Sequence, residues 1–325
     1  MLAEVAAAAV EPPDMSVVLL VDQERERGAR CLRSVLAQSI VDRLEVLLVD
    51  LAGPDAGPLA GSDHPRVRVL RPPATASFGE LHAEGVLRAR APIVAFLEEH
   101  CVALPGWAEA MVRAHRGPAA AVGGERHNPA PQRSLAQFIH LLDNGPWSAP
   151  AVEQTTKMLP AGNVAYKWDV LMRYRDRLSL YFQSEGLLQA KMIEDGLTFR
   201  VEPAAKYQHE YDDSLAELVA RWFWQGYAIG AARAELLGGT RRRRARHLWR
   251  WLKGVAFPPV VLVRLIAARS PGRTRLVLSK VHVALLYPMS HVSGDVAGTL
   301  LGRQGRDERV RHRLLNGRRA ARGAQ

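Results

Sequence analysis

The stretch "IVAFLEEHCVALPGW", residues 93–107, decides the fold and locates the chemistry. It begins with five apolar residues, which is typical of a buried strand. Glu98, Glu99 and His100 follow directly, and a Pro-Gly pair then predicts a turn. Two carboxylates and an imidazole are groups that can bind a divalent cation, so we expect this strand to end at a ligand site.

Strand and helix patterns alternate on the N-terminal side of this stretch. Short apolar or alternating runs predict strands at residues 16–21, 44–50, 66–70 and 92–97. Helical spacing of apolar residues predicts helices at 29–38 and 78–91. Alternation of this kind predicts an α/β fold, with a mostly parallel, Rossmann-like central sheet flanked by helices.

Acidic residues follow three of the predicted strands. Asp22, Asp50 and the cluster at 98–100 would all lie beyond the carboxyl ends of strands, where α/β sheets bind ligands. Neither G-x-G-x-x-G nor G-K-[ST] opens the first helix, so backbone binding of phosphate is not expected. A divalent metal held by Glu98, Glu99 or His100 would supply the counter-charge for a nucleotide instead.

Charge is distributed unevenly along the 325 residues. Residues 1–240 carry 24 Lys and Arg against 30 Asp and Glu, a balance of −6, whereas residues 241–325 carry 20 against 3, a balance of +17. Such a basic tail suggests a polyanionic partner, either nucleic acid or an anionic membrane surface, with a solvated terminus as the alternative. No nucleic acid is expected, because no reader motif accompanies the "RRRR" run at 241–244.

The same patterns suggest a domain division. Residues 1–14 have no export signal and are expected to be a disordered leader. Residues 15–240 would form one α/β domain, with regular alternation of strands and helices at about 15–130 and a more irregular half at about 131–240. Residues 241–325 would form basic amphipathic helices and a tail.

Two apolar stretches in the tail, "VAFPPVVLV" at 255–263 and "VHVALLYPMSHVSG" at 281–294, are shorter than a membrane span requires. Trp249, Trp251 and Phe257 accompany them among basic residues. This composition favours a helix in the membrane interface, with a spanning helix and a soluble helical appendage as alternatives.

Taken in order, these features resemble the bacterial family 2 glycosyltransferases, which are inverting enzymes of the GT-A fold. The family shows "VVDDGS", "ARNxG", "FLDDDC" and "GW" patterns where this chain has "LLVDLAG", "LHAEG", "FLEEHC" and "PGW". The resemblance extends over roughly residues 15–302, since "SHVSGDVAGTLLG" is similar to a C-terminal helix of many bacterial members.

This resemblance implies a metal site, for Mn²⁺ or Mg²⁺, with an E-E-H variant of the family's D-x-D motif. Glu98 stands at the first Asp position, Glu99 follows, and His100 replaces the usual last carboxylate. A similar "FLDSHC" occurs in polypeptide N-acetylgalactosaminyltransferases. His209, in "VEPAAKYQHEY", stands where many members have a further metal or phosphate ligand, although a structural histidine is the alternative.

The resemblance also implies that residues 15–240 are a GT-A catalytic domain, with a nucleotide-binding half at about 15–130 and an acceptor half at about 131–240, and it implies roles for single residues. Asn163, in "AGNVAYKWDVL", matches a segment that shapes the donor and acceptor pocket. Glu185, in "SEGLLQAKMIEDG", matches the catalytic base, although Ser184 stands where the family has Glu. The "EDG" at 194–196 is the alternative position for the base.

The implied reaction is attack by an acceptor hydroxyl on the anomeric carbon of a nucleotide sugar, with inversion. Asp50 and Asp22 would accept hydrogen bonds from the nucleoside, and Glu98 would act near the donor phosphates. The acceptor would be a saccharide or a lipid-linked saccharide of a cell-envelope or exopolysaccharide glycan. The enzyme would be cytoplasmic and peripheral to the inner face of the membrane, and a homo-oligomer is left open.

Two other functions remain as alternatives. A nucleotidyltransferase could use a similar sheet, but it normally needs a glycine-rich basic signature near the first strand, which this sequence lacks. A non-catalytic protein that only binds a membrane or a partner would explain Ser184 and the missing second Asp after Asp50.

Overall fold

The computed structural model describes residues 12–143, 147–160, 162–238 and 271–303, and a few further positions up to Leu314. The strands are β1 (Met15–Val21), β2 (Leu44–Asp50), β3 (Val67–Leu70), β4 (Ile93–Glu98), β5 (Cys101–Ala103), β6 (Ala121–His127), β7 (Gln154–Thr156), β8 (Asn163–Lys167) and β9 (Phe199–His209). The α-helices are α1 (Arg25–Leu36), α2 (Phe78–Arg88), α3 (Trp107–Ala114), α4 (Ser134–Leu142), α5 (Trp168–Met172), α6 (Leu178–Tyr181), α7 (Glu185–Glu194), α8 (Leu215–Leu236), α11 (Pro271–Ser279) and α12 (Val281–Leu301). Three short 3₁₀ turns are η1 (Val41–Arg43), η2 (Pro54–Ala56) and η3 (Arg175–Arg177).

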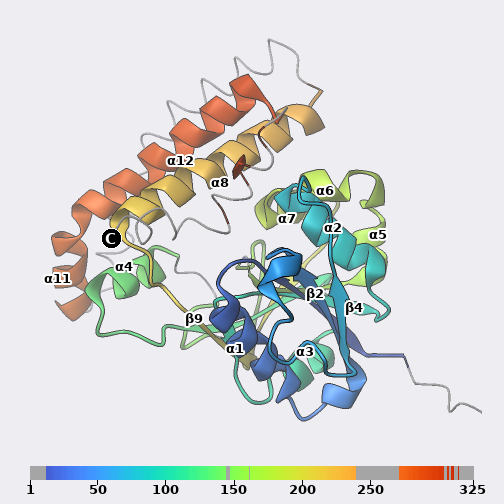
Figure 1. The fold of residues 1–325 in the computed structure, drawn as a ribbon. Coiled ribbons are helices and arrows are strands. Elements are labelled where there is room, and N and C mark those ends of the chain that lie inside the picture. Colours follow the sequence, from blue (N-terminus) through green and yellow to red (C-terminus); the bar gives the residue numbers. More distant parts are fainter. Residues whose placement is uncertain are drawn as a thin grey trace, which may run out of the picture.

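All described strands form one mixed sheet in the order β3-β2-β1-β4-β8-β6-β9-β5, with β7 beside β9. The first four strands are parallel, as the sequence predicts. Beyond β4 the directions mix, because β8 is antiparallel to both β4 and β6, and β9 is parallel to β6 and antiparallel to β5 and β7. The α/β class with helices flanking a central sheet is confirmed (Figure 1).

Each face of the sheet has its own hydrophobic core. Alternate residues of β1 point to opposite faces, so Val17 and Leu19 join the core beneath α1 and α3, while Val18 and Leu20 join the core beneath α2, α6 and α7. Because β1 and β4 are buried on both faces, they appear in the sequence as continuous apolar runs.

The N-terminal boundary differs slightly from the expected one. Residues 1–11 of the predicted leader lie outside the described part of the chain. Asp14, which the prediction included in that leader, donates its N–H to the carbonyl oxygen of Arg43 at 2.8 Å and forms an ion pair with the Arg43 side chain. The ordered structure therefore includes the last residues assigned to the leader.

The long helices α8 and α12 lie side by side, apart from the sheet (Figure 1). Glycines bring their backbones into direct contact: a Cβ on Gly294 would lie 1.8 Å from the carbonyl oxygen of Phe223, and one on Gly298 would lie 2.0 Å from that of Tyr227. Because later residues of α12 meet later residues of α8, the two helices run parallel.

This pairing joins the two segments that the sequence analysis separated. The expected boundary near residue 240, the "RRRR" run and the stretch at 255–263 all lie outside the described residues. The stretch at 281–294 forms most of α12, which packs on α8 of the predicted catalytic domain. Of the helices that the structure describes, none has the length and apolar character to cross a bilayer.

The glycine contacts predict that a large side chain at Gly294 will separate α8 from α12. Gly294→Leu should lower the free energy of unfolding by about 3 kcal/mol, because backbone atoms of Phe223 occupy the space that the new side chain needs. Thermal unfolding with limited proteolysis would measure this. Gln225→Leu, at an exposed position on α8, is the matched control and should change little; equal stability of both variants would contradict the packing.

Candidate metal and active site

Three side chains from separate strand ends converge at one edge of the sheet. Glu98 is the last residue of β4, and His209 is the last residue of β9. In the antiparallel β5–β9 pair, Cys101 lies opposite His209, which brings the preceding residue, His100, beside it. The sheet thus assembles a group whose members are spread from residue 98 to residue 209 of the sequence.

The ligand atoms of these side chains are close enough to share one ion. Nε2 of His100 lies 3.0 Å from Nε2 of His209 and 3.0 Å from Oε2 of Glu98, and Nε2 of His209 lies 3.7 Å from the same oxygen. Donor atoms bonded to one ion at about 2.1 Å are separated by roughly 3 Å. Two imidazoles and a carboxylate in this arrangement therefore fit a divalent metal.

Electrostatics keeps two of these groups in their metal-binding forms. Burial acts to raise the pKa of Glu98, but charge interaction and hydrogen bonding with His100 and His209 outweigh it and hold the pKa well below its ordinary value. Burial, together with the charge of His100, lowers the pKa of His209 to about 3. An ionised carboxylate and a neutral imidazole are the states that bind metals.

Glu99, the other predicted ligand of this turn, is not among the clustered ligand atoms. Its Oε2 accepts a hydrogen bond from the backbone N–H of Asp22 at 3.2 Å. Burial raises the pKa of Glu99 to about 7. Cys101, which the sequence analysis did not select, lies in the group instead, within 4.8 Å of the other ligand atoms. Burial raises its pKa well above the ordinary value, so it is a protonated thiol and a weak ligand.

Glu185, the predicted catalytic base, begins α7 and is brought close to the metal group. Its Oε2 accepts a hydrogen bond from the backbone N–H of Gly162 at 3.2 Å, while its buried Oε1 has no partner among the described residues. Burial, and to a lesser extent the charge of Glu98, raises the pKa of Glu185 to about 8. The predicted base and the predicted metal ligand thus belong to one site.

Gly162 connects these two carboxylates through its backbone. Its carbonyl oxygen accepts a hydrogen bond from the N–H of Glu98 at 3.1 Å, and its own N–H binds Glu185. A Cβ at this position would lie 2.4 Å from Oε2 of Glu98, and φ is +83°, in the region that favours glycine. The "AGN" motif contains this glycine, but its contacts could not be identified without the fold.

The predicted nucleotide-binding residues have different environments. Asp50 is buried, and its Oδ1 accepts a hydrogen bond from Nη1 of Arg25 at 2.6 Å, so it lies at the expected edge but is already ion-paired. Asp22 lies beside it, directly after β1. Asn163 has no exposed surface, and its Oδ1 accepts a hydrogen bond from Nε1 of Trp107 at 3.0 Å, so it holds the "PGW" turn.

The segment that follows His209 is held by ion pairs to several elements. Acidic residues here bind arginines from α1, from the residue before α4, and from α8. The pairs are Arg30 with Glu210 (2.8 Å), Arg27 and Arg133 with Asp212, and Arg221 with Asp213 (2.5 Å). The ring of Tyr211 also packs on His209, with 4.4 Å between centroids. These contacts fix the end of β9 and thus the position of His209.

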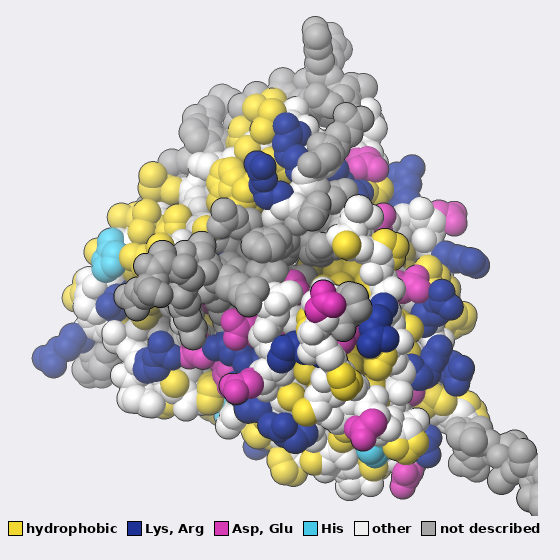
Figure 2. Space-filling view, viewed as in Figure 1, with side chains coloured by type: hydrophobic (Ala, Val, Ile, Leu, Met, Phe, Trp, Pro, Cys, Tyr) yellow, Lys and Arg dark blue, Asp and Glu magenta, His cyan; other side chains and the backbone are white. Residues whose placement is uncertain are grey.

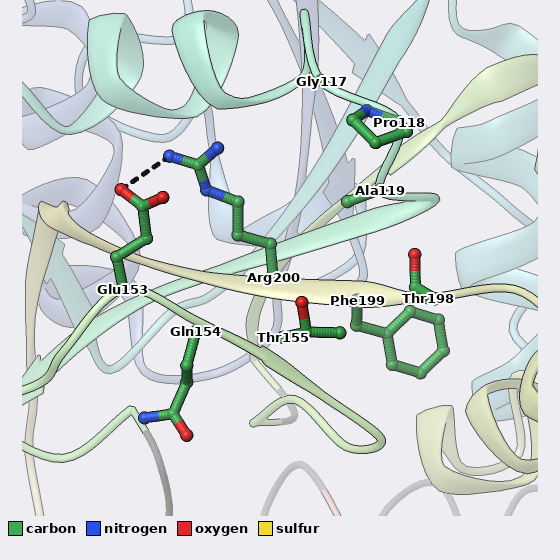
Figure 3. A pocket seen from close by; sticks show the side chains of 9 residues that line it. All are labelled: Gly117, Pro118, Ala119, Glu153, Gln154, Thr155, Thr198, Phe199 and Arg200. Atoms are coloured by element: carbon green, nitrogen blue, oxygen red, sulfur yellow. Dashed lines mark ion pairs between the residues drawn. The ribbon is translucent and has the colours of Figure 1, made fainter.

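A separate cavity of about 270 Å³ lies near the start of β6 and β9, where an ion pair joins Arg200 and Glu153 at 2.9 Å (Figure 3). Phe199 and Thr155 also line it. Because β6 and β9 run parallel and their carboxyl ends lie at the metal group, this cavity is at the opposite edge of the sheet. It plays no part in the candidate active site.

Comparison with solved structures identifies the fold as the GT-A type of glycosyltransferases. A mannosyltransferase from Pyrobaculum calidifontis, in complex with GDP-Man and Mn²⁺, has a TM-score of 0.53 and 16% sequence identity, and the match covers 89% of this chain and 87% of that one. GalNAc-T7 with UDP, GalNAc and Mn²⁺ has a TM-score of 0.47 and 12% identity, over 62% of this chain and 43% of that one.

Sequence comparison gives a partial family match. Residues 16–162 match the family described as "Glycosyl transferase family 2", a segment that includes Glu98 and His100 and ends at Gly162. Among curated protein sequences, none matches the chain significantly.

Gly162→Ala should weaken binding of Mn²⁺ by about tenfold or more, since the new methyl group displaces the Glu98 carboxylate. Gly196→Ala is the matched control, because Gly196 also has a positive φ of +80° but has no atom within 4 Å of the added Cβ. Calorimetric titration with Mn²⁺ would compare the two variants. Equal loss of affinity in both would mean that backbone strain, and not contact with Glu98, is responsible.

Proposed function

We propose that this chain is a metal-dependent, inverting glycosyltransferase that moves a sugar from a nucleotide-sugar donor to an acceptor hydroxyl. The observation that carries the proposal is the convergence of Glu98, His100 and His209 beside the buried Glu185. The family match over 16–162 and the GT-A fold support this reaction class. GDP-Man and Mn²⁺ in the similar mannosyltransferase support a donor and an ion of the same kinds.

Glu98, His100 and His209 would hold the metal, Mn²⁺ or Mg²⁺. A bound divalent ion would neutralise the negative charge that develops on the leaving nucleoside diphosphate. The protein's part is to keep the three ligand atoms together before the ion binds, so that little reorganisation is needed. Asp50 and Asp22, at the neighbouring strand ends, would contact the nucleoside.

Glu185 would accept the proton of the acceptor hydroxyl as the new glycosidic bond forms. A carboxylate with a raised pKa binds a proton more tightly than an ordinary one, which suits this role. The Gly162 N–H binds one carboxylate oxygen, and the other, buried and without a partner among the described residues, would take the proton. A single displacement with this base inverts the anomeric carbon and needs no covalent enzyme intermediate.

The acceptor and the pathway rest on the resemblance to bacterial family members. They suggest a saccharide or lipid-linked saccharide acceptor, in the synthesis of a cell-envelope or exopolysaccharide glycan. In this proposal the acceptor attacks the anomeric carbon, whereas a nucleotidyltransferase would direct the attack to phosphorus. The masses of the products would distinguish the two reactions.

His100→Ala should weaken Mn²⁺-dependent binding of nucleotide sugars by at least about tenfold, because it removes one of three ligands. A thermal-shift screen of nucleotide sugars, with and without Mn²⁺, would measure this effect. His127→Ala is the matched control, since His127 lies at the end of β6, pairs with Glu125 at 2.8 Å and is not in the metal group. If wild-type protein binds neither ion nor nucleotide, the enzymatic proposal is wrong.

Glu185→Gln should preserve donor binding and reduce sugar transfer by about 10²-fold or more, because the amide cannot accept the acceptor proton. Initial rates of transfer and donor affinity would be measured on the same preparation. Glu194→Gln, at an exposed position at the other end of α7, tests the alternative "EDG" base and should retain transfer. Loss of transfer in Glu194→Gln alone would reverse the assignment of the base.

A further inference from the structure

The outer face of α12 carries an apolar ridge that no described element covers fully. We define the α12 ridge as Val281, Leu285, Met289, Val292, Val296 and Leu300, which recur every three or four residues and so share one side of the helix. Four of them are exposed: Val281 by 37%, Leu285 by 45%, Met289 by 57% and Leu300 by 49%. Hydrophobic side chains gather over this part of the molecule in the space-filling view (Figure 2).

The opposite side of α12 packs against α8. Gly294 and Gly298 meet the α8 backbone, and Asp295 forms an ion pair with Arg233 at 3.0 Å. The helix is therefore fixed through its inner side, and the ridge points away from the protein that the structure describes. The ridge runs along a helix of 21 residues, which is roughly 30 Å long. A continuous apolar strip of this length differs from the single exposed apolar residues that are common on protein surfaces.

The charge around the α12 ridge identifies the kind of partner. Within residues 271–303, Asp295 is the only acidic residue in the sequence, and it is already paired. Arg275 and Lys280 precede the ridge; Arg306 and Arg309 follow it with Asp307 and Glu308 between them, so the excess of basic residues is greater before the ridge than after it. A negatively charged surface with an apolar layer beneath it would satisfy both the basic ends and the ridge, and an anionic lipid bilayer has this chemistry. A nucleic acid would satisfy the charge but not the apolar side chains.

We propose that α12 lies in the interface of an anionic bilayer, with the α12 ridge inserted among the lipids and the basic residues at its ends near the headgroups. The attachment is peripheral, in accord with the absence of a spanning helix among the described residues. α8 begins six residues after His209, and Arg221 of α8 binds Asp213 in the intervening segment. Bilayer contact would thus hold the candidate active site at the membrane surface.

The test uses the full chain and vesicles of phosphatidylcholine with 30% phosphatidylglycerol, compared with phosphatidylcholine alone. Wild-type protein should sediment with the anionic vesicles, less so at high salt. Val281→Ser/Leu285→Ser/Met289→Ser should reduce that binding by about tenfold or more. Leu87→Ser/Val152→Ser removes exposed apolar side chains elsewhere and is the matched control, which should bind as wild type does.

Further outcomes would overturn the proposal. A large fall in the unfolding temperature of the triple variant would show that the chain itself covers the α12 ridge, and a dimer that the variant dissociates would show that a second copy does. Binding to duplex DNA but not to vesicles would make nucleic acid the partner.

Met289→Trp gives an independent measurement of insertion. The fluorescence of the new tryptophan should shift to the blue with anionic vesicles, and no shift would contradict insertion. Donor binding is measured in parallel without vesicles. A protein that binds the donor but not the vesicles would contradict the membrane proposal and leave the proposed transfer activity intact.

Discussion

The antiparallel pairing of β5 with the end of β9 is the constraint on which the candidate site depends. It places Cys101 opposite His209. His100 therefore lies beside the imidazole of His209, which comes 109 residues later in the sequence. Glu98 then completes the group, because β4 ends at the same edge. The ion pairs and the Tyr211 ring after His209 hold this strand end in place, so that the metal group depends on tertiary contacts from several elements.

The sequence predicted the parallel part of the fold well, because buried strands there are continuous apolar runs separated by helices. It did not predict the mixed directions beyond β4, since short strands such as β5 and β7 have no local signal for their partners. Which residues of the 98–100 cluster come together also depends on the fold. Side chains alternate along a strand, so residues 98 and 100 share one side, and they lie in the clustered group whereas Glu99 binds the backbone of Asp22.

Other site features could not be predicted from residue types. Gly162 acts through its N–H, its carbonyl oxygen and the absence of a side chain, and none of these differs between one glycine and another in sequence. Asn163 matched a family segment, but its contact is with Trp107 in the protein interior. The parallel packing of α8 and α12 likewise depends on glycines that meet the backbone of the facing helix, such as Gly294 at Phe223 and Gly226 at His291, which are distant in the sequence.

Because the backbone of one residue, Gly162, joins Glu98 to Glu185, the two halves of the proposed chemistry are coupled. A shift of the Gly162 backbone that suits a bulkier donor would move the base relative to the acceptor at the same time. Side-chain replacements elsewhere leave this main-chain link intact. Changes of sugar specificity during evolution would therefore be easier through the surrounding loops than through the strand end that carries the metal ligand.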